Sequence, residues 1–210
     1  MNELIGLISL AIAVISYSLY ITHTLKGYTK PHAITWLVWG LLNGSVFFEQ
    51  LAGGAGPGAW VTAAAAVANL FIFGLALRLG ERTVTRFDWV CLALVGVLLL
   101  TWALIADPVI VVFLAITIFL LGLFPTLRKS ATQAHEETAS TYALNGFKFF
   151  LALLALNTIT VTTALYPLVL FLVNCGFALY LVVARYYQGK AVIIERKGTL
   201  RGRAKKTRRR

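Results

Sequence analysis

The sequence LNGSVFF at residues 42–48 returns as LNGFKFF at residues 144–150, and the basic turn TLK at 24–26 returns as TLR at 126–128. Each matched residue follows its counterpart by 102 positions, as Asn145 follows Asn43, and the match needs no gap. Matches at Leu and Phe carry little weight in so apolar a chain, whereas the basic turn and the Asn-Gly step carry more. Such a repeat predicts a two-fold membrane protein with its working site between the halves.

The composition is that of a membrane protein. Only 13% of the residues are charged and 59% are hydrophobic, which is too apolar for an ordinary soluble domain of 210 residues. The apolar runs are long enough to cross a bilayer, which takes about 20 residues each. We therefore predict an all-α membrane protein with a longest internal loop at 128–137 and seven transmembrane helices, at about 3–24, 32–52, 59–79, 88–106, 108–127, 138–157 and 162–187.

The basic residues predict the orientation. Of the 19 lysines and arginines, all except Lys148 fall in or beside the first, third and fifth connections or toward the C-terminus. Because positive charge is retained in the cytoplasm, we expect an N-terminus outside and a C-terminus inside, in the inner (plasma) membrane of a bacterium. With six or eight spans these basic residues would fall on both sides of the membrane, so the charges favour seven spans.

The repeat then gives the domain organisation. The first three predicted helices match the last three, and the single helix between them inverts the chain, so the two repeats run parallel about an axis along the membrane normal. We expect a first three-helix bundle at 1–79, a linker helix at 80–107, a second three-helix bundle at 108–188 and a basic cytoplasmic tail at 189–210.

Over nearly all of residues 3–188 this arrangement resembles the SWEET and PQ-loop superfamily. Its signature is Pro-Gln near the cytoplasmic end of the first helix of each bundle, followed by a basic turn. The second repeat keeps Pro125 but has Thr126 in place of the glutamine, and the first repeat has lost both, as in a divergent member. The resemblance implies transport of a small solute (a sugar, an amino acid or a related metabolite) by alternating access between the bundles. Pro125 is then a candidate hinge for gating.

The resemblance also implies a substrate site. In SWEET-type transporters an asparagine on the third helix of each bundle faces the central cavity, and this chain has Asn69 and Asn174 on the corresponding predicted helices. They are 105 residues apart, so matching them at the 102-residue offset needs a three-residue insertion in a turn between helices. A carboxamide offers both a donor and an acceptor to a polyol or an amino acid, and it is costly to leave unpaired within a membrane. The alternative is a hydrogen bond between helices that locks the bundle.

Asn43 and Asn145 are the second candidate pair. They lie at mid-depth on the second and sixth predicted helices, where the adjoining Gly44 and Gly146 would let another helix come close. One interpretation is small-residue packing with the amide bonded across helices. The other is a second polar rim of the same cavity.

Gating candidates come from charged and aromatic side chains. Glu49 corresponds to position 151 of the second repeat, about 4.5 Å along a helix axis from Lys148. We predict that the two pair across the bundle interface as part of an outer gate. The alternative is that Glu49 reaches the outer interface and that Lys148 is a structural lysine, either charged or neutral. Trp36 and Trp39 are candidates for an inner gate or for interface anchors.

The remaining polar residues suggest simpler roles. Glu136 and Glu137 precede the sixth predicted helix, where acidic side chains favour the helix dipole. The histidines, His32 among them, are expected in solvated loops, with proton coupling as the alternative.

Other functional classes are weaker. The chain has no His-x-x-x-His set, no paired intramembrane aspartates and no Ser-His constellation, so we expect no enzyme, catalytic residue, metal or cofactor. The alternative to a transporter is a non-transporting membrane sensor or a scaffold for a membrane complex. Expected partners are a small polar solute and anionic lipid headgroups at the basic tail, but not nucleic acid, because no aromatic residues interleave with the charges. A second copy of the chain, in a homo-oligomer, is a further candidate partner.

Overall fold

The protein is helical throughout the part that the structure describes. The computed structural model describes the backbone of residues 1–105 and 107–207 and the side chains of residues 1–105 and 107–189. This part has two short 3-10 helices, η1 (Gly56–Ala59) and η2 (Ala134–Glu136), no strand, and seven α-helices: α1 (Asn2–Leu25), α2 (Ala33–Ala52), α3 (Trp60–Leu79), α4 (Arg86–Leu104), α5 (Pro108–Gln133), α6 (Ala139–Leu154) and α7 (Val161–Thr207).

Five of these helices are long and apolar enough to cross a membrane: α1, α3 extended by η1, α4, α5 and α7. The sequence predicted seven spans, and the two helices that fall short are α2 and α6. Helix α6 has only 16 residues, and α2 carries Asn43, Glu49 and Gln50 within its 20 residues. These two helices occupy matching places in the repeat, and each packs against three or more other helical segments. The apolar helices support an integral membrane protein.

Short-range chemistry defines several helix ends. At the start of α4, the Thr85 hydroxyl accepts from the backbone N–H of Asp88 while the Asp88 carboxylate accepts from the backbone of Thr85, which is a capping box. At the start of α5, the Asp107 carboxylate accepts from two backbone N–H groups, and Pro108 occupies the first turn, where proline has no hydrogen bond to lose. After α1 the chain turns at Gly27, whose φ of 75° favours glycine.

Two boundaries differ from the sequence prediction. Helix α5 continues to Gln133 and is followed by η2, so most of the predicted loop at 128–137 is helical. Lys129 is buried there because its ammonium group meets a carboxylate, as described below. Helix α7 continues to Thr207 rather than ending near residue 187. The predicted contact of the basic tail with lipid headgroups involves side chains after residue 189, which lie outside the described residues.

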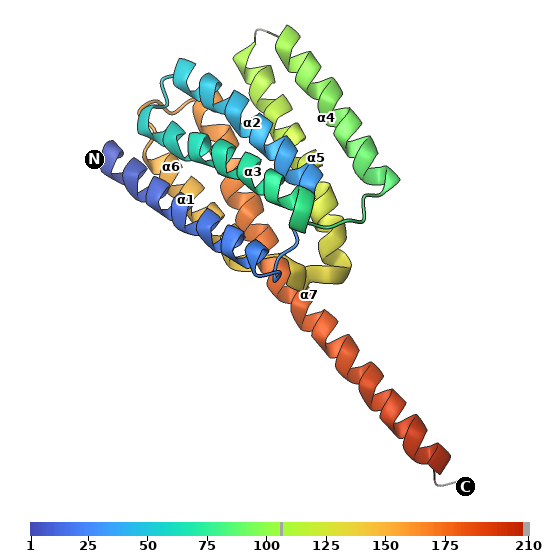
Figure 1. Cartoon of the computed structure of the whole chain (residues 1–210). Coiled ribbons are helices and arrows are strands. Elements are labelled where there is room, and N and C mark those ends of the chain that lie inside the picture. The colour runs from blue at the N-terminus through green and yellow to red at the C-terminus, as the bar shows by residue number, and fades with distance from the viewer. Residues whose placement is uncertain (106, 208–210) are drawn as a thin grey trace.

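The connections gather at two ends of the molecule (Figure 1). We call one the basic end, where residues 26–32, 80–85 and 134–138 lie and where α7 leaves the bundle. Backbone hydrogen bonds from Lys30 to Glu136 and from Glu81 to Pro31, each 3.0 Å, join these connections. We call the other the opposite end, where the N-terminus and residues 53–59 and 155–160 meet, and where Asn157 N–H donates to the Ala55 carbonyl.

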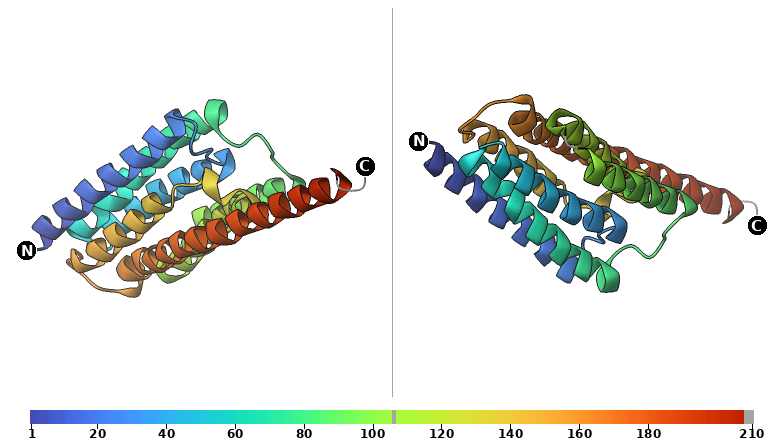
Figure 2. Two further views of the ribbon diagram at one scale, coloured as in Figure 1. Left: turned by 90° about the horizontal axis from the view of Figure 1, so that it is seen from below. Right: turned by 90° about the horizontal axis from the view of Figure 1, so that it is seen from above.

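The helix packing is the same in both halves. Helix α3 packs against both α1 and α2, and α7 packs against both α5 and α6. Contacts between α1 and α6 and between α2 and α5 join these sets, while α4 packs mainly on α5 and lies at the edge of the molecule (Figure 1). The helices run roughly along one direction, with α7 projecting past the basic end (Figure 2).

Candidate functional site

A small cavity lies among six helices, and all four asparagines predicted from the sequence line it. We call it the central cavity. Its volume of about 20 Å³ leaves room for about one water molecule. Its lining is aromatic and carboxamide in character, with residues from α1, α2, α3, α5, α6 and α7: Tyr17, Trp36, Trp39, Asn43, Asn69, Phe119, Asn145, Phe149, Leu170 and Asn174.

Both halves of the repeat contribute to this lining. Tyr17 and Phe119, like Asn43 and Asn145, are separated by 102 residues, and each pair lies on equivalent helices. Asn69 of α3 and Asn174 of α7 form the third pair at the predicted offset of 105. The cavity therefore lies where the two repeats meet.

Asn43 and Asn145 are bonded to neighbouring helices. Asn43 donates to the Trp39 carbonyl over 2.7 Å and accepts from the hydroxyl of Tyr166 on α7 over 3.3 Å. Asn145 accepts from the hydroxyl of Ser16 on α1 over 2.9 Å. These contacts agree with the first interpretation, amides bonded across helices, although both residues also reach the cavity.

The glycines beside these asparagines differ from each other. A Cβ at Gly146 would lie 2.4 Å from the Cys175 sulfur, so this glycine lets α7 approach α6 as predicted. The prediction is wrong for Gly44, where a Cβ would meet nothing within 4 Å. Close approach on α2 occurs one turn earlier, at Gly40, against Leu70 of α3.

Asn69 and Asn174 form no hydrogen bond to another helix within the described residues. Asn174 donates to the Leu170 carbonyl of its own helix over 2.8 Å. The Asn69 oxygen is buried and has no hydrogen-bond partner in the described part of the chain. The hydrogen bond between helices that was considered for this pair is therefore absent from the described residues, and the Asn69 oxygen is an acceptor without a donor there.

Trp36 and Trp39 lie between the central cavity and the basic end. Trp36 is in the first turn of α2 and packs on Tyr20 at 4.6 Å between ring centroids. Trp39 stacks on Phe119 at 5.1 Å and donates its indole N–H to the Phe119 carbonyl. Both side chains are buried, which differs from the exposed position of an interface anchor, and their role in an inner gate stays a prediction.

The predicted pair of Glu49 and Lys148 is absent from the described residues, and neither side chain forms an ion pair there. The Lys148 ammonium lies 3.9 Å from the centre of the Tyr17 ring, on the side of α6 that faces α1. Glu49 instead faces α5. The reason is topological: α2 meets α5 and α6 meets α1, so side chains at similar depth on α2 and α6 do not face each other.

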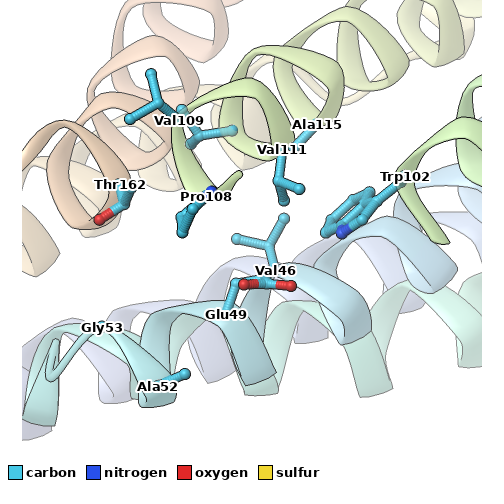
Figure 3. A pocket seen from close by; sticks show the side chains of 11 residues that line it. Val46, Glu49, Ala52, Gly53, Trp102, Pro108, Val109, Val111, Ala115 and Thr162 are labelled. Atoms are coloured by element: carbon cyan, nitrogen blue, oxygen red, sulfur yellow. The ribbon is translucent and has the colours of Figure 1, made fainter. Parts of the chain in front are cut away.

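Glu49 lines a second, larger pocket (Figure 3). We call it the lateral pocket. It has a volume of about 280 Å³, and its walls are mostly apolar, from α2, α4, α5 and the start of α7: Val46, Glu49, Ala52, Gly53, Trp102, Pro108, Val109, Val111, Val112, Ala115 and Thr162. Val46 and Ala115 are about one helical turn from Asn43 and Phe119 of the central cavity. The lateral pocket thus lies along α2 and α5, between the cavity and the opposite end.

A buried polar cluster at the basic end was missed by the sequence analysis. Lys129 donates to Glu137 over 2.6 Å, and the hydroxyls of Tyr20 and Tyr142 donate to the other carboxylate oxygen over 3.1 and 3.2 Å. The expectation that Glu137 acts only as a charge near a helix N-terminus is therefore incomplete. Recognising α5 beyond residue 128 would have revealed Lys129 on the buried face of a helix.

A second cluster joins α4, α5 and the start of α2. The Arg128 guanidinium binds the buried Asp88 carboxylate at 2.8 and 3.2 Å. His32, expected in a solvated loop, is only 1% exposed, and its Nε2 lies 3.5 Å from Asp88. Burial lowers the pKa of His32 below its usual value, and the Asp88 carboxylate opposes this shift only in part.

Pro125 lies inside α5 and does not end the helix. It is buried, and the next residue, Thr126, shares a hydrogen bond of 3.0 Å with Thr35 of α2. The proline removes one backbone hydrogen bond from α5 close to its contact with α2. This position suits the predicted hinge.

Comparison with known proteins gives no relative: no family model, no curated protein and no solved structure matches the chain significantly.

Proposed function

We propose that the protein is a small-solute transporter that works by alternating access between two three-helix bundles. In this proposal α1, α2 and α3 form one bundle, α5, α6 and α7 form the other, and α4 is the linker. The equivalence of the packing in the two halves supports this 3+1+3 arrangement. It is the architecture of the SWEET and PQ-loop superfamily, in which we place the chain by this proposal.

The single observation that carries the proposal is the lining of the central cavity. Three pairs of equivalent residues, one member from each half, converge on it, and two of the pairs are carboxamides. A site shared by both bundles is what rocking of one bundle against the other requires. The unpaired oxygen of Asn69 gives a hydroxyl or ammonium group of a solute an acceptor.

On this proposal the structure corresponds to a closed state of the transporter. The cavity has room for about one water molecule, and Trp36, Trp39 and the buried Glu137 cluster lie between it and the basic end. The lateral pocket reaches from the opposite end to within about one helical turn of the cavity. We take the lateral pocket as the vestibule for the solute, with Glu49 in its wall, and the basic end as the cytoplasmic side of a bacterial inner membrane.

Thermal stability in detergent tests the site, with a panel of sugars, amino acids and vitamins. A bound solute at 100 times its dissociation constant should add about 2.7 kcal/mol of stability. We expect this shift in the wild type and its loss in the Asn69→Ala/Asn174→Ala double variant. Asn157→Ala is the matched control, because Asn157 is exposed at the opposite end and its hydrogen bonds within the described residues go only to Asn2 and the backbone.

Flux into liposomes separates a transporter from a sensor or scaffold. Uptake of the compound that stabilises the protein, lost in the double variant and kept in Asn157→Ala, is the expected result. Binding without uptake would favour a sensor. If no compound shifts the stability and the double variant is merely less stable, the asparagines only hold helices together. A scaffold role would then be favoured over transport.

A further inference from the structure

The side-chain amine of Lys148 has no acidic partner in the described part of the chain. Its side chain is fully buried, and its Nζ has no hydrogen-bond partner among the described residues. Its Nζ lies 3.9 Å from the centre of the Tyr17 ring and 5.1 Å from the centre of the Phe149 ring. By contrast, the other buried lysine of the described part, Lys129, binds the carboxylate of Glu137.

Lys148 lies next to the central cavity. Tyr17 and Phe149 both line that cavity, so Nζ is within one aromatic ring of it. Asn145, one turn earlier on the same helix, lines it as well. The cavity lining contains no aspartate or glutamate, and none of the ion pairs in the described residues includes Lys148. The described residues therefore place a lysine amine and neutral amides here, but no acidic side chain.

A buried ammonium group needs a counter-charge or hydrogen bonds in a medium of low dielectric constant. An aromatic face supplies part of this stabilisation, but it leaves the three N–H donors of the ammonium unused. We infer that the transported solute carries a carboxylate, which pairs with Lys148 Nζ once the Tyr17 ring moves aside. This inference rests on the proposed transport function and names the class of solute.

A carboxylate fits better than a phosphate. One lysine supplies a single positive charge, and the cavity lining contains no arginine, the residue whose fork binds phosphate at two points. The amides of Asn69 and Asn174 then remain for the rest of the solute, with both donors and acceptors.

The repeat argues against a purely structural role for the lysine. The counterpart of Lys148, 102 residues earlier, is Val46, which lines the lateral pocket. An aliphatic side chain therefore occupies the same helical position in the other half. On this basis we expect Lys148→Met to fold, since methionine keeps the length of the chain and is apolar.

The test uses the fluorescence of the purified full-length protein, because Trp36 and Trp39 line the cavity. The probes are acetate, lactate and succinate, each paired with its neutral amide: acetamide, lactamide and succinamide. We expect at least one carboxylate to change the fluorescence saturably while its amide does not. In Lys148→Met its dissociation constant should rise by about 30-fold or more, as for loss of one partner of a buried charge pair, and Lys148→Arg should retain binding.

Lys26→Met is the control, because Lys26 lies in an exposed turn, and it should bind as the wild type does. If Lys148→Met does not fold, Lys148→Gln takes its place. The inference is wrong if no carboxylate of the panel binds, if acid and amide bind alike, or if binding is unchanged in the folded Lys148 variant.

Flux in liposomes keeps this inference distinct from the proposed function. Uptake of a neutral solute such as glucose that does not depend on Lys148 would support the transport function and overturn the carboxylate inference. Carboxylate binding that depends on Lys148, without uptake of any compound, would contradict the proposed transport function and support the carboxylate site.

Discussion

Lys129 and Glu137 form an ion pair of 2.6 Å in which the two side chains are only 2% and 0% exposed. Lys129 comes from α5, and Glu137 lies between η2 and α6. Tyr20 of α1 and Tyr142 of α6 bind the same carboxylate, so one buried charge connects several helices at the basic end. A pair so completely buried differs from a surface pair in its effect on stability. Removing one partner leaves the other as a buried charge without a counter-charge.

Glu137→Gln should therefore lower the free energy of unfolding by about 3–5 kcal/mol, the range for breaking a buried pair. Glu136→Gln is the matched control. It removes the partner of Lys30, in a pair whose side chains are 47% and 22% exposed, and should cost about 1 kcal/mol or less. Denaturant titration in detergent measures both. Equal losses in the two variants would show that burial of the pair contributes nothing to stability.

Gly146 and Gly44 provide a second matched comparison, since they occupy the same position in the two repeats. Gly146→Ala should destabilise the protein by about 1–3 kcal/mol, because its Cβ would overlap the Cys175 sulfur and press on the backbone of α7. Gly44→Ala should be neutral or stabilising by up to about 1 kcal/mol, because its Cβ has free space and alanine favours a helix. Thermal unfolding of the two variants side by side checks this. A larger loss at Gly44 would contradict the packing described here.

The sequence predicted more of the helix positions than of the contacts between helices. Hydrophobic run length predicted the positions of seven helices. The repeat singled out Asn43 and Asn145, and the resemblance to SWEET-type transporters singled out Asn69 and Asn174; all four line the central cavity. Run length and the repeat are local or periodic signals, so they survive without knowledge of the tertiary structure. Helix α5 ran past the predicted end because Lys129 is stabilised by Glu137, a partner supplied by tertiary structure.

The pairing of Glu49 with Lys148 failed for a related reason. Repeat coordinates give depth along the helices, but they do not say which helix faces which. Because α2 meets α5 and α6 meets α1, equal depth on α2 and α6 does not bring side chains together. The burial of His32 was missed likewise, since a histidine before a helix gives no sign of a buried carboxylate from α4.

Pro125 offers a test of the hinge. Pro125→Ala should restore a backbone hydrogen bond inside α5 and raise the free energy of unfolding by up to about 3 kcal/mol, while slowing uptake if bending of α5 accompanies transport. Pro108→Ala is the control, because proline in the first turn of α5 costs little. Stability and liposome uptake are measured on both. A variant that is more stable and transports at the wild-type rate would remove the hinge role.

His32 should make stability depend on pH. Burial lowers its pKa in the folded protein below the usual 6.5; Asp88 opposes the shift, and Arg128 and Lys129 add to it. In the window below pH 6.5 the unfolded chain therefore binds more protons than the folded one, so stability is complete above that pH and falls as the solution is acidified. The slope from this one group is at most about 1.4 kcal/mol per pH unit.

Unfolding of the wild type, His32→Gln and His135→Gln between pH 5 and 8 measures this slope. We expect His32→Gln to reduce the loss of stability on acidification, because glutamine cannot take up the proton that the buried imidazole resists. His135 is exposed, so His135→Gln should keep the wild-type profile. If the profile of His32→Gln also matches the wild type, the acid sensitivity comes from other groups and the role of His32 is wrong.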